Sequence, residues 1–295
     1  MFCDLHLHST ASDGTVGPAD LPRLAVAAGL GAIALTDHDT TEGLPVCAAA
    51  CRKARIDFAP GIEISADPGP PPDADPDSPV RRGTLHILGL FVRHDATKLH
   101  EVRDRMRAAR DSRNPAIIAR LNDLRIRIDY EEVVELARGQ GTQIIGRPHI
   151  AQVLIGKGYA KSVQDAFTRY LRQGGPAYVR RDCLAAAEAI DAIHDAGGLA
   201  VLAHPVQLQI TDPGRLEHFV RHLKDLGLDG IETRHSGHGP SDVERFEILA
   251  DRYRLLTSGG SDFHGTRKPV ELGSQRVPME IYHRLRGAVL EDGAS

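Results

Sequence analysis

Residues 4–14 of the chain read DLHLHSTASDG. The segment Phe2–Leu7 is predicted to form a β-strand, and because side chains alternate along a strand, His6 and His8 point to the same face. Asp13 follows on a glycine-containing loop that can fold back over that face. Imidazole and carboxylate groups bind divalent metal ions. This stretch therefore predicts part of a metal site at the end of the first strand.

The same residue types recur along the rest of the chain, each at the end of an apolar segment. They occur in Asp37-His38-Asp39, at Glu63 and His86, in His204-Pro205 and in Asp262-Phe263-His264. Any one of them alone is more often a hydrogen-bonded structural residue, and Asp13 alone could simply shape a turn. Together they would be costly to bury unless they were paired or metal-bound. Ligands at the carboxyl ends of successive strands describe the mouth of a barrel, so the sequence predicts a metallohydrolase with a multinuclear site.

Strand and helix patterns alternate at both ends of the chain but not in its middle. Strands are predicted at 2–7, 31–36, 56–64, 84–92, 199–204, 230–234 and 255–258, with helices between most of them. Such alternation favours parallel strands joined by crossover helices. The middle instead shows five helical segments, at 95–113, 115–124, 130–138, 149–155 and 163–172. We therefore expect a barrel formed by residues 1–97 and 180–295, capped over its mouth by a helical insertion of residues 98–179.

Two polar segments interrupt the barrel pattern. Asp67–Gly83 contains six prolines and is predicted to be a surface loop that buries no core. Val206–Pro213, after His204, is the second such segment. Both are expected to leave strands at the catalytic face, where they could narrow or gate the pocket.

The composition limits the kinds of partner. A length of 295 residues with 41% hydrophobic residues suits one barrel, or a domain plus an insertion. A net charge of −4 argues against electrostatic binding of extended duplex, and 4% aromatics without tryptophan argue against a base-stacking platform. The four cysteines lack the two close pairs of a zinc ribbon and are predicted to be reduced thiols. With no apolar run near 18 residues and no leader, we expect a cytoplasmic protein with no membrane contact and no obligate protein partner.

The segments DLHLHSTASDG, ALTDHDT, GIEIS, LHILG, AHP and GGSDFHG resemble the signature blocks of the PHP (polymerase and histidinol phosphatase) family, in the family's order. They cover the chain from residue 2 to about residue 273. The resemblance implies an α/β fold, a distorted seven-stranded (β/α) barrel, and phosphoester hydrolysis at a three-metal centre. The helical insertion with IGRPHIA resembles the branch that contains nucleoside 3′,5′-bisphosphate phosphatases and a 5′→3′ RNA-trimming exonuclease.

The resemblance also implies which residues hold each metal ion. The first ion would be bound by His6, His8, Glu63 and Asp262. The second would share Glu63 and be bound by His86 and His204, and the third by Asp13, His38 and His264. Mn²⁺ is the expected metal, with Zn²⁺ and Fe²⁺ as alternatives for this ligand set. A metal-bridging hydroxide would attack phosphorus in line.

Candidate substrate residues lie outside the metal set. Arg147 and His149 stand in Gly146-Arg147-Pro148-His149, where an arginine fork matches phosphate oxygens; Arg147 could instead pair with a surface acid. Arg113 is predicted to begin the second insertion helix, and it could reach a second phosphate or simply be solvated, as could the neighbouring Arg180 and Arg181. His235, at the end of a strand, is a candidate proton donor to the leaving group, although an exposed or supporting role fits it equally well.

Three functions are consistent with these residues. The first is metal-dependent hydrolysis of the 3′-phosphate of nucleoside 3′,5′-bisphosphates, with trimming of short RNA from its 5′ end as a related activity. The second is histidinol-phosphate phosphatase, which the insertion and IGRPHIA disfavour. The third is a non-catalytic, metal-binding PHP module, in which lost ligands would be expected, whereas all nine positions carry a residue able to bind metal.

Overall fold

The computed structural model describes residues 1–69, 83–141 and 144–292. Most of the predicted loop Asp67–Gly83 therefore lies outside the described residues. The strands are β1 Phe2–Leu7, β2 Leu30–Leu35, β3 Asp57–Asp67, β4 Leu85–Leu90, β5 Leu184–Ala185, β6 Leu199–Leu202, β7 Gly230–His235, β8 Leu256–Gly260 and β9 Val277–Pro278. The α-helices are α1 Leu21–Ala27, α2 Leu44–Ala54, α3 Thr97–Asp123, α4 Tyr130–Gly139, α5 Arg147–Gly156, α6 Val163–Ala166, α7 Ala186–Asp195, α8 Pro213–Asp225, α9 Pro240–Arg252 and α10 Met279–Asp292. Short helical turns are η1 Phe167–Leu171, η2 Pro205–Leu208 and η3 Gly265–Arg267.

One sheet runs in the order β8-β7-β6-β4-β3-β2-β1-β9, with β5 paired to β3. The sheet curls back on itself, because the residues after β8 bond to β1. Asp262 N donates to His6 O at 2.9 Å and His8 N donates to Phe263 O at 2.9 Å. Seven longer strands thus form a nearly closed barrel, and the two-residue strands β5 and β9 are added at its sides. The predicted PHP-type barrel is confirmed in architecture, with two short strands more than expected.

The direction of β4 corrects the prediction of uniformly parallel strands. β4 pairs antiparallel with both β3 and β6, and Ser65 lies opposite His86. β3 and β4 thus lie side by side in opposite directions, as the two strands of a hairpin do. Because β4 runs the other way, His86 reaches the barrel mouth from the amino end of its strand and not from the carboxyl end.

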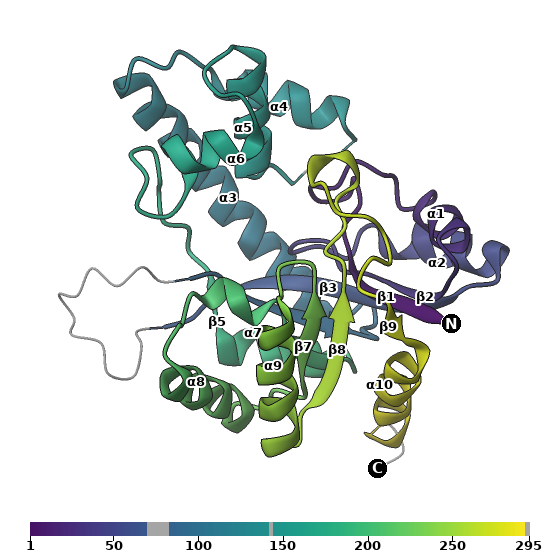
Figure 1. Ribbon diagram of the computed structural model, residues 1–295. Coiled ribbons are helices and arrows are strands. Elements are labelled where there is room, and N and C mark those ends of the chain that lie inside the picture. The colour runs from purple at the N-terminus through teal and green to yellow at the C-terminus, as the bar shows by residue number, and fades with distance from the viewer. Residues whose placement is uncertain (70–82, 142–143, 293–295) are drawn as a thin grey trace.

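Helices cover the outside of the barrel, with α7, α8 and α9 on one side and α1 and α2 on another (Figure 1). Leucine, isoleucine and valine side chains from these helices and from the strands form the main core. A smaller core beneath α10 includes Tyr282, which is 2% exposed. Within the described residues, no helix combines the length and the apolar character needed to span a membrane.

The insertion begins with one long helix, whereas the sequence predicted two. α3 continues through Pro115, which removes only its own backbone N–H from the helical bonding. Buried residues on both sides, including Met106 and Ile117, keep the helix intact. Arg113 therefore lies within α3 and does not begin a second helix. The predicted helix at 163–172 is α6 followed by the π-helical turn η1.

The insertion has a core of its own. Side chains from Ile117 to Ala177 form a separate hydrophobic cluster, whereas Leu99, Val102 and Met106 at the start of α3 belong to the barrel core. Figure 1 shows α4, α5 and α6 grouped away from the sheet, with α3 running between the two parts. The division at residues 98 and 179 remains a prediction, and α3 is the element that joins the two cores.

Candidate metal centre

The nine predicted ligands come together at one end of the barrel. His6 lies on β1 and Glu63 within β3, whereas His8, His38 and His204 follow the ends of β1, β2 and β6. Asp262 and His264 both follow β8, which ends at Gly260. Asp262 has a left-handed backbone with φ of 57°. The close approach of the chain to β1 explains this ending, since Gly260 lies against the His6 backbone with no room for a Cβ.

Glu63 is the centre of the cluster. Its Oε1 lies 2.7 Å from His86 Nδ1 and 2.8 Å from His204 Nε2. Its Oε2 lies within 3.4 Å of ring nitrogens of three further histidines, namely His38 at 2.8 Å, His8 at 3.2 Å and His6 at 3.4 Å. A fully buried carboxylate that meets five imidazoles is suited to bridge two cations.

Two more carboxylates complete the cluster on either side of His8. Asp13 Oδ1 lies 3.3 Å from His264 Nε2 and 3.9 Å from His38 Nε2. Asp262 Oδ1 lies 3.3 Å from His8 Nε2 and 3.7 Å from His6 Nε2. The geometry therefore brings together all nine residues; their division among three ions remains a prediction.

The donor set fits divalent metal ions. Many of its buried nitrogen and oxygen atoms have no hydrogen-bond partner within the described residues. They include His6 Nε2, both ring nitrogens of His8, Asp13 Oδ1, His38 Nδ1, Glu63 Oε2 and His204 Nδ1. Buried polar atoms are normally bonded, so the presence of many unpartnered ones on the residues of a single cluster indicates bound cations. Ligand atoms of His8, Asp13, His38 and His264 lie within 4.8 Å of each other, as do those of His38, Glu63 and His86.

Electrostatics within the cluster favour the metal-binding forms of several residues. Burial opposes ionisation of Glu63, but the surrounding histidines outweigh it and hold the pKa of Glu63 well below its usual range. Burial lowers the pKa of both His204 and His264 to about 4, so these rings are neutral at pH 7 and keep a free lone pair. Burial likewise disfavours charge on His6, yet Glu232 and Glu63 raise its pKa well above the usual value.

Acids that flank the ligands shape the loops. Asp37 accepts from Ser9 N at 2.7 Å and from Ser12 Oγ at 2.5 Å, which folds the loop before Asp13. Asp4 accepts from Ser261 N and Gly273 N, each at 2.8 Å, which fixes the segment before Asp262. Asp37, which directly precedes His38, thus organises the backbone of the loop before Asp13.

Asp39 joins the metal centre to the insertion. It is fully buried, accepts from Ser65 N at 2.8 Å, and pairs with Arg181 at 3.1 Å and with Arg110 of α3. These arginines hold the pKa of Asp39 below its usual value despite burial. Arg110 was not among the sequence candidates, although it stands three residues before Arg113 and so shares a helix face with it.

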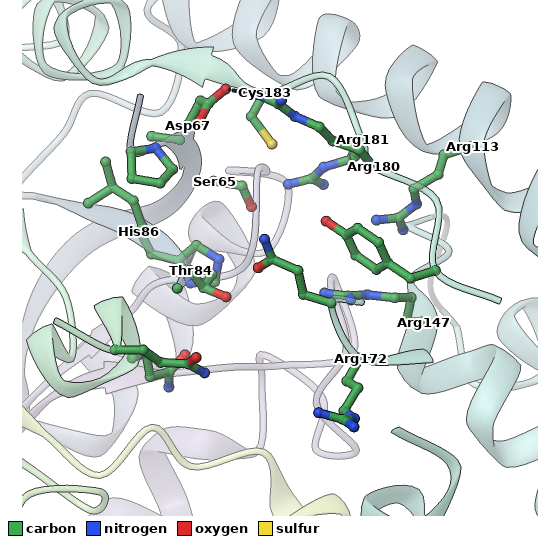
Figure 2. Close-up of a pocket in the computed structure, with 18 of the residues that line it drawn as sticks. Ser65, Asp67, Thr84, His86, Arg113, Arg147, Arg172, Arg180, Arg181 and Cys183 are labelled. Atoms are coloured by element: carbon green, nitrogen blue, oxygen red, sulfur yellow. Dashed lines mark hydrogen bonds and ion pairs between the residues drawn. The ribbon is translucent and has the colours of Figure 1, made fainter. Parts of the chain in front are cut away.

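Two adjoining hollows lie between the metal cluster and the insertion. The smaller, of about 140 Å³, is lined by Asp13 and His38 together with Arg110 and Arg147. The larger, which we call the chamber, has a volume of about 620 Å³; it begins at His86 and extends outward along the insertion. Figure 2 shows His86 and Thr84 across this chamber from Arg113 and Arg147.

Three of the chamber's guanidinium groups have no carboxylate partner among the described residues. Arg113 is 7% exposed and bonds only to Asn114 Oδ1, at 3.1 and 3.4 Å, and burial lowers its pKa to about 8. Arg147 donates to Leu171 O at 2.9 Å and stacks against Phe167 and Tyr178. It does not pair with a surface acid, which was the alternative from the sequence. The third is Arg172, which donates to a backbone carbonyl.

Other candidates lie at the margins of the site. His149 is fully buried, accepts from Gly146 N at 3.0 Å through Nδ1, and lines neither hollow. His235 is also buried; its Nδ1 accepts from Gly237 N at 2.9 Å and its Nε2 lies 3.5 Å from Asp262 Oδ2. Lys268, which the sequence did not single out, lies 2.6 Å from the same carboxylate oxygen of Asp262. Arg180 and Arg181 pair with acids and are not simply solvated.

Comparison with known proteins points to one family. The model of the PHP domain matches residues 4–175, which include six of the nine candidate ligands. A 3′,5′-nucleoside bisphosphate phosphatase from Chromobacterium violaceum is 33% identical over 284 residues, covering 88% of this chain and 86% of that protein. The 5′-3′ exoribonuclease Rnm of Salmonella typhimurium is 32% identical over 272 residues, covering 92% of this chain and 87% of that protein.

A solved structure supports the same relationship. A crystal structure described as a metal-dependent phosphoesterase, from Bifidobacterium adolescentis, superposes with a TM-score of 0.81 at 30% sequence identity. The match covers 96% of this chain and 94% of that one, so it includes the insertion as well as the barrel.

Proposed function

This chain belongs to the PHP domain family and is a metal-dependent phosphoesterase, and on that premise we propose that it removes the 3′-phosphate from nucleoside 3′,5′-bisphosphates. The observation that carries the proposal is a pair of guanidinium groups, those of the buried Arg113 and the half-buried Arg147, that face the metal cluster across the chamber and lack carboxylate partners among the described residues. A substrate with two phosphates offers one to the metal cluster and the other to these arginines. Arginine forks bind phosphate through paired, charge-assisted hydrogen bonds.

The nine residues of the cluster would hold three divalent ions, with Mn²⁺ as the expected metal. When bound, these ions supply Lewis-acid polarisation of the phosphate oxygens and an activated water molecule. The protein's own contribution is to position the substrate through its second phosphate, the one that is not cleaved, and to exclude bulk water. Arg147 is suited to positioning because its guanidinium is fixed by Leu171 O and two aromatic rings. His149 fixes the backbone of Gly146, immediately before Arg147.

We assign protonation of the leaving alkoxide to His235, a histidine at the barrel mouth that is not among the nine ligands. Its Nδ1 accepts the Gly237 backbone proton, which leaves Nε2 as the nitrogen that can carry a proton toward the site. This Nε2 has no hydrogen-bond partner within the described part of the chain. A histidine is suited to such a transfer near neutral pH.

Trimming of short RNA from its 5′ end is the second candidate. The observation that favours it is the outward extension of the 620 Å³ chamber past Arg147 toward Arg172 and Arg180, where further phosphates of a strand would find positive charge. The relative Rnm is named for exoribonuclease activity.

A substrate panel tests the proposal. Phosphate or nucleotide release by the Mn²⁺-loaded protein is measured on adenosine 3′,5′-bisphosphate, 5′-AMP, histidinol phosphate and a 5′-phosphorylated RNA oligomer. We expect the highest kcat/KM on the bisphosphate, with 5′-AMP as the product. Preference for the RNA would replace the leading proposal by the second. Preference for histidinol phosphate would refute both.

A further inference from the structure

One buried carboxylate beside the metal centre belongs to none of the predicted ligand sets. Glu232 lies within β7 and is fully buried. Its two oxygens have different partners. Oε1 lies 3.2 Å from His6 Nδ1, and Oε2 accepts from the backbone N–H of His204 at 2.7 Å. Glu232 therefore touches two predicted ligands that the family pattern assigns to different metal ions.

The contact with His6 determines which ring nitrogen is free. An ionised carboxylate only accepts hydrogen bonds, so a bond to Glu232 requires the proton to be on Nδ1. The other nitrogen, Nε2, then carries a free lone pair, and it lies 3.4 Å from Glu63 Oε2 and 3.7 Å from Asp262 Oδ1. This arrangement of carboxylate, imidazole and cation is the usual way in which a metal-binding histidine is held in orientation.

The contact with His204 fixes an unusual backbone. His204 follows β6 with φ of 26° and ψ of 65°, a left-handed conformation that costs a residue other than glycine of the order of 1–3 kcal/mol. The short hydrogen bond from its N–H to Glu232 holds the backbone there. In that conformation the ring places Nε2 at 2.8 Å from Glu63 Oε1. Loss of the bond would release the turn and with it the direction of the ring.

We propose that Glu232 is a positioning residue that sets the orientation of His6 and of His204 together, and so couples the binding of two metal ions. The proposal rests on the metal dependence of the family and not on the choice of substrate. Glu232→Gln is the sharpest change, because an amide has a single acceptor oxygen and cannot serve both N–H groups. Its NH₂ group would face the donor that it leaves behind.

The chain offers a matched control on the same strand. Asp229 precedes β7 at its other end, and it also accepts from a histidine, His194 Nε2, at 2.8 Å and from a backbone N–H, that of Ala200, at 2.8 Å. Both of these contacts are made by one oxygen, Oδ2, which an amide could retain, so the control is Asp229→Ala, which removes the whole double contact far from the metal ligands. Any general effect of weakening the β6–β7 pair appears in both variants.

The experiment measures Mn²⁺ and Zn²⁺ affinity by chelator competition, and metal content at saturation, for the wild type and both variants. For Glu232→Gln we expect a loss of affinity of about 10- to 100-fold with unchanged content at saturating metal, and for Asp229→Ala the wild-type affinity. Equal affinities in the two variants would overturn the proposal. Loss of one full metal equivalent in Glu232→Gln would also overturn it, since Glu232, His6 and His235 would then be ligands of an ion themselves.

A second measurement needs no variant and remains informative if Glu232→Gln does not fold. Long-range ¹H–¹⁵N NMR of the Zn²⁺-loaded wild-type protein, labelled at histidine, reports the tautomer of each ring. We expect His6 to carry its proton on Nδ1. A proton on Nε2 would contradict the proposed contact with Glu232. Because neither measurement uses a substrate, their failure is distinguishable from failure of the proposed phosphatase activity.

Discussion

Arg113 is expected to strengthen substrate binding and, because its charge is buried, to lower the stability of the substrate-free protein. Arg113 is 7% exposed, its guanidinium bonds to an amide oxygen and to no carboxylate among the described residues, and burial lowers its pKa from the ordinary arginine value to about 8. At about 1.4 kcal/mol per pKa unit, that change corresponds to roughly 6 kcal/mol of lost preference for the charged form. This value is an upper limit for the stability that replacement of Arg113 could add, because the substitution also removes the hydrogen bonds to Asn114 and alters the packing of the side-chain stem.

Arg113→Met keeps an unbranched apolar stem and removes the charge. Replacement of buried charges by apolar groups of similar volume is often neutral or stabilising by about 1–4 kcal/mol, so the free energy of unfolding should rise by up to that amount. A hydrogen bond to a charged group contributes about 1.5–3 kcal/mol. The KM for adenosine 3′,5′-bisphosphate should therefore rise by roughly 10- to 150-fold.

The assays are urea denaturation without substrate and steady-state phosphate release. The control is Arg105→Met on the same helix, where the arginine is exposed and pairs with Glu188. Its free energy of unfolding should change by no more than about 1 kcal/mol, and its KM should stay at the wild-type value. A destabilised Arg113→Met protein with wild-type KM would refute the reasoning, because Arg113 would then be a structural residue and not a phosphate contact.

Three further predictions concern the metal ligands and the residues around them. Asp13→Ala and His264→Ala should each abolish turnover while circular dichroism shows the fold retained; full activity in either would contradict the three-metal assignment. Asp39→Asn leaves two buried arginines without their carboxylate, so urea denaturation should show a loss of about 3–5 kcal/mol, and a loss below 1 kcal/mol would exclude a structural ion pair. Burial lowers the pKa of His149 to about 4, so its contribution to stability is fully present above about pH 6.5 and is lost as pH falls toward 4, by roughly 3 kcal/mol. In His149→Asn, which keeps an acceptor for Gly146 N, the loss of unfolding free energy between about pH 6.5 and pH 4 should be smaller by that amount, and an unchanged loss would show that His149 makes no such contribution.

The barrel and the position of its ligands followed from local patterns. Alternation of side chains along β1 places His6 and His8 on one face, and apolar strands ending at polar residues mark the mouth. The direction of β4 did not follow, because an apolar strand reads alike in either direction. His86 was found nonetheless, since it lies at the boundary between the polar loop and the strand.

The residues that the sequence analysis missed depend on tertiary packing. Arg110 belongs to a charged stretch of α3 in which several arginines are solvent-exposed, and which of them faces the barrel is decided by how the insertion docks. Its spacing of three from Arg113 was the available signal. Glu232 lies on a strand that is buried on both faces, so alternation could not show whether its side chain points into the barrel or toward the helices.

We propose that a metal cluster of these nine residues hydrolyses a phosphomonoester. The decisive measurement is phosphate release from adenosine 3′,5′-bisphosphate by protein stripped of metal and then titrated with Mn²⁺. We expect no release from the stripped protein and activity that rises to a plateau at about three metal equivalents, with 5′-AMP as the product. Full activity in the stripped protein, or none in the loaded protein, would contradict it.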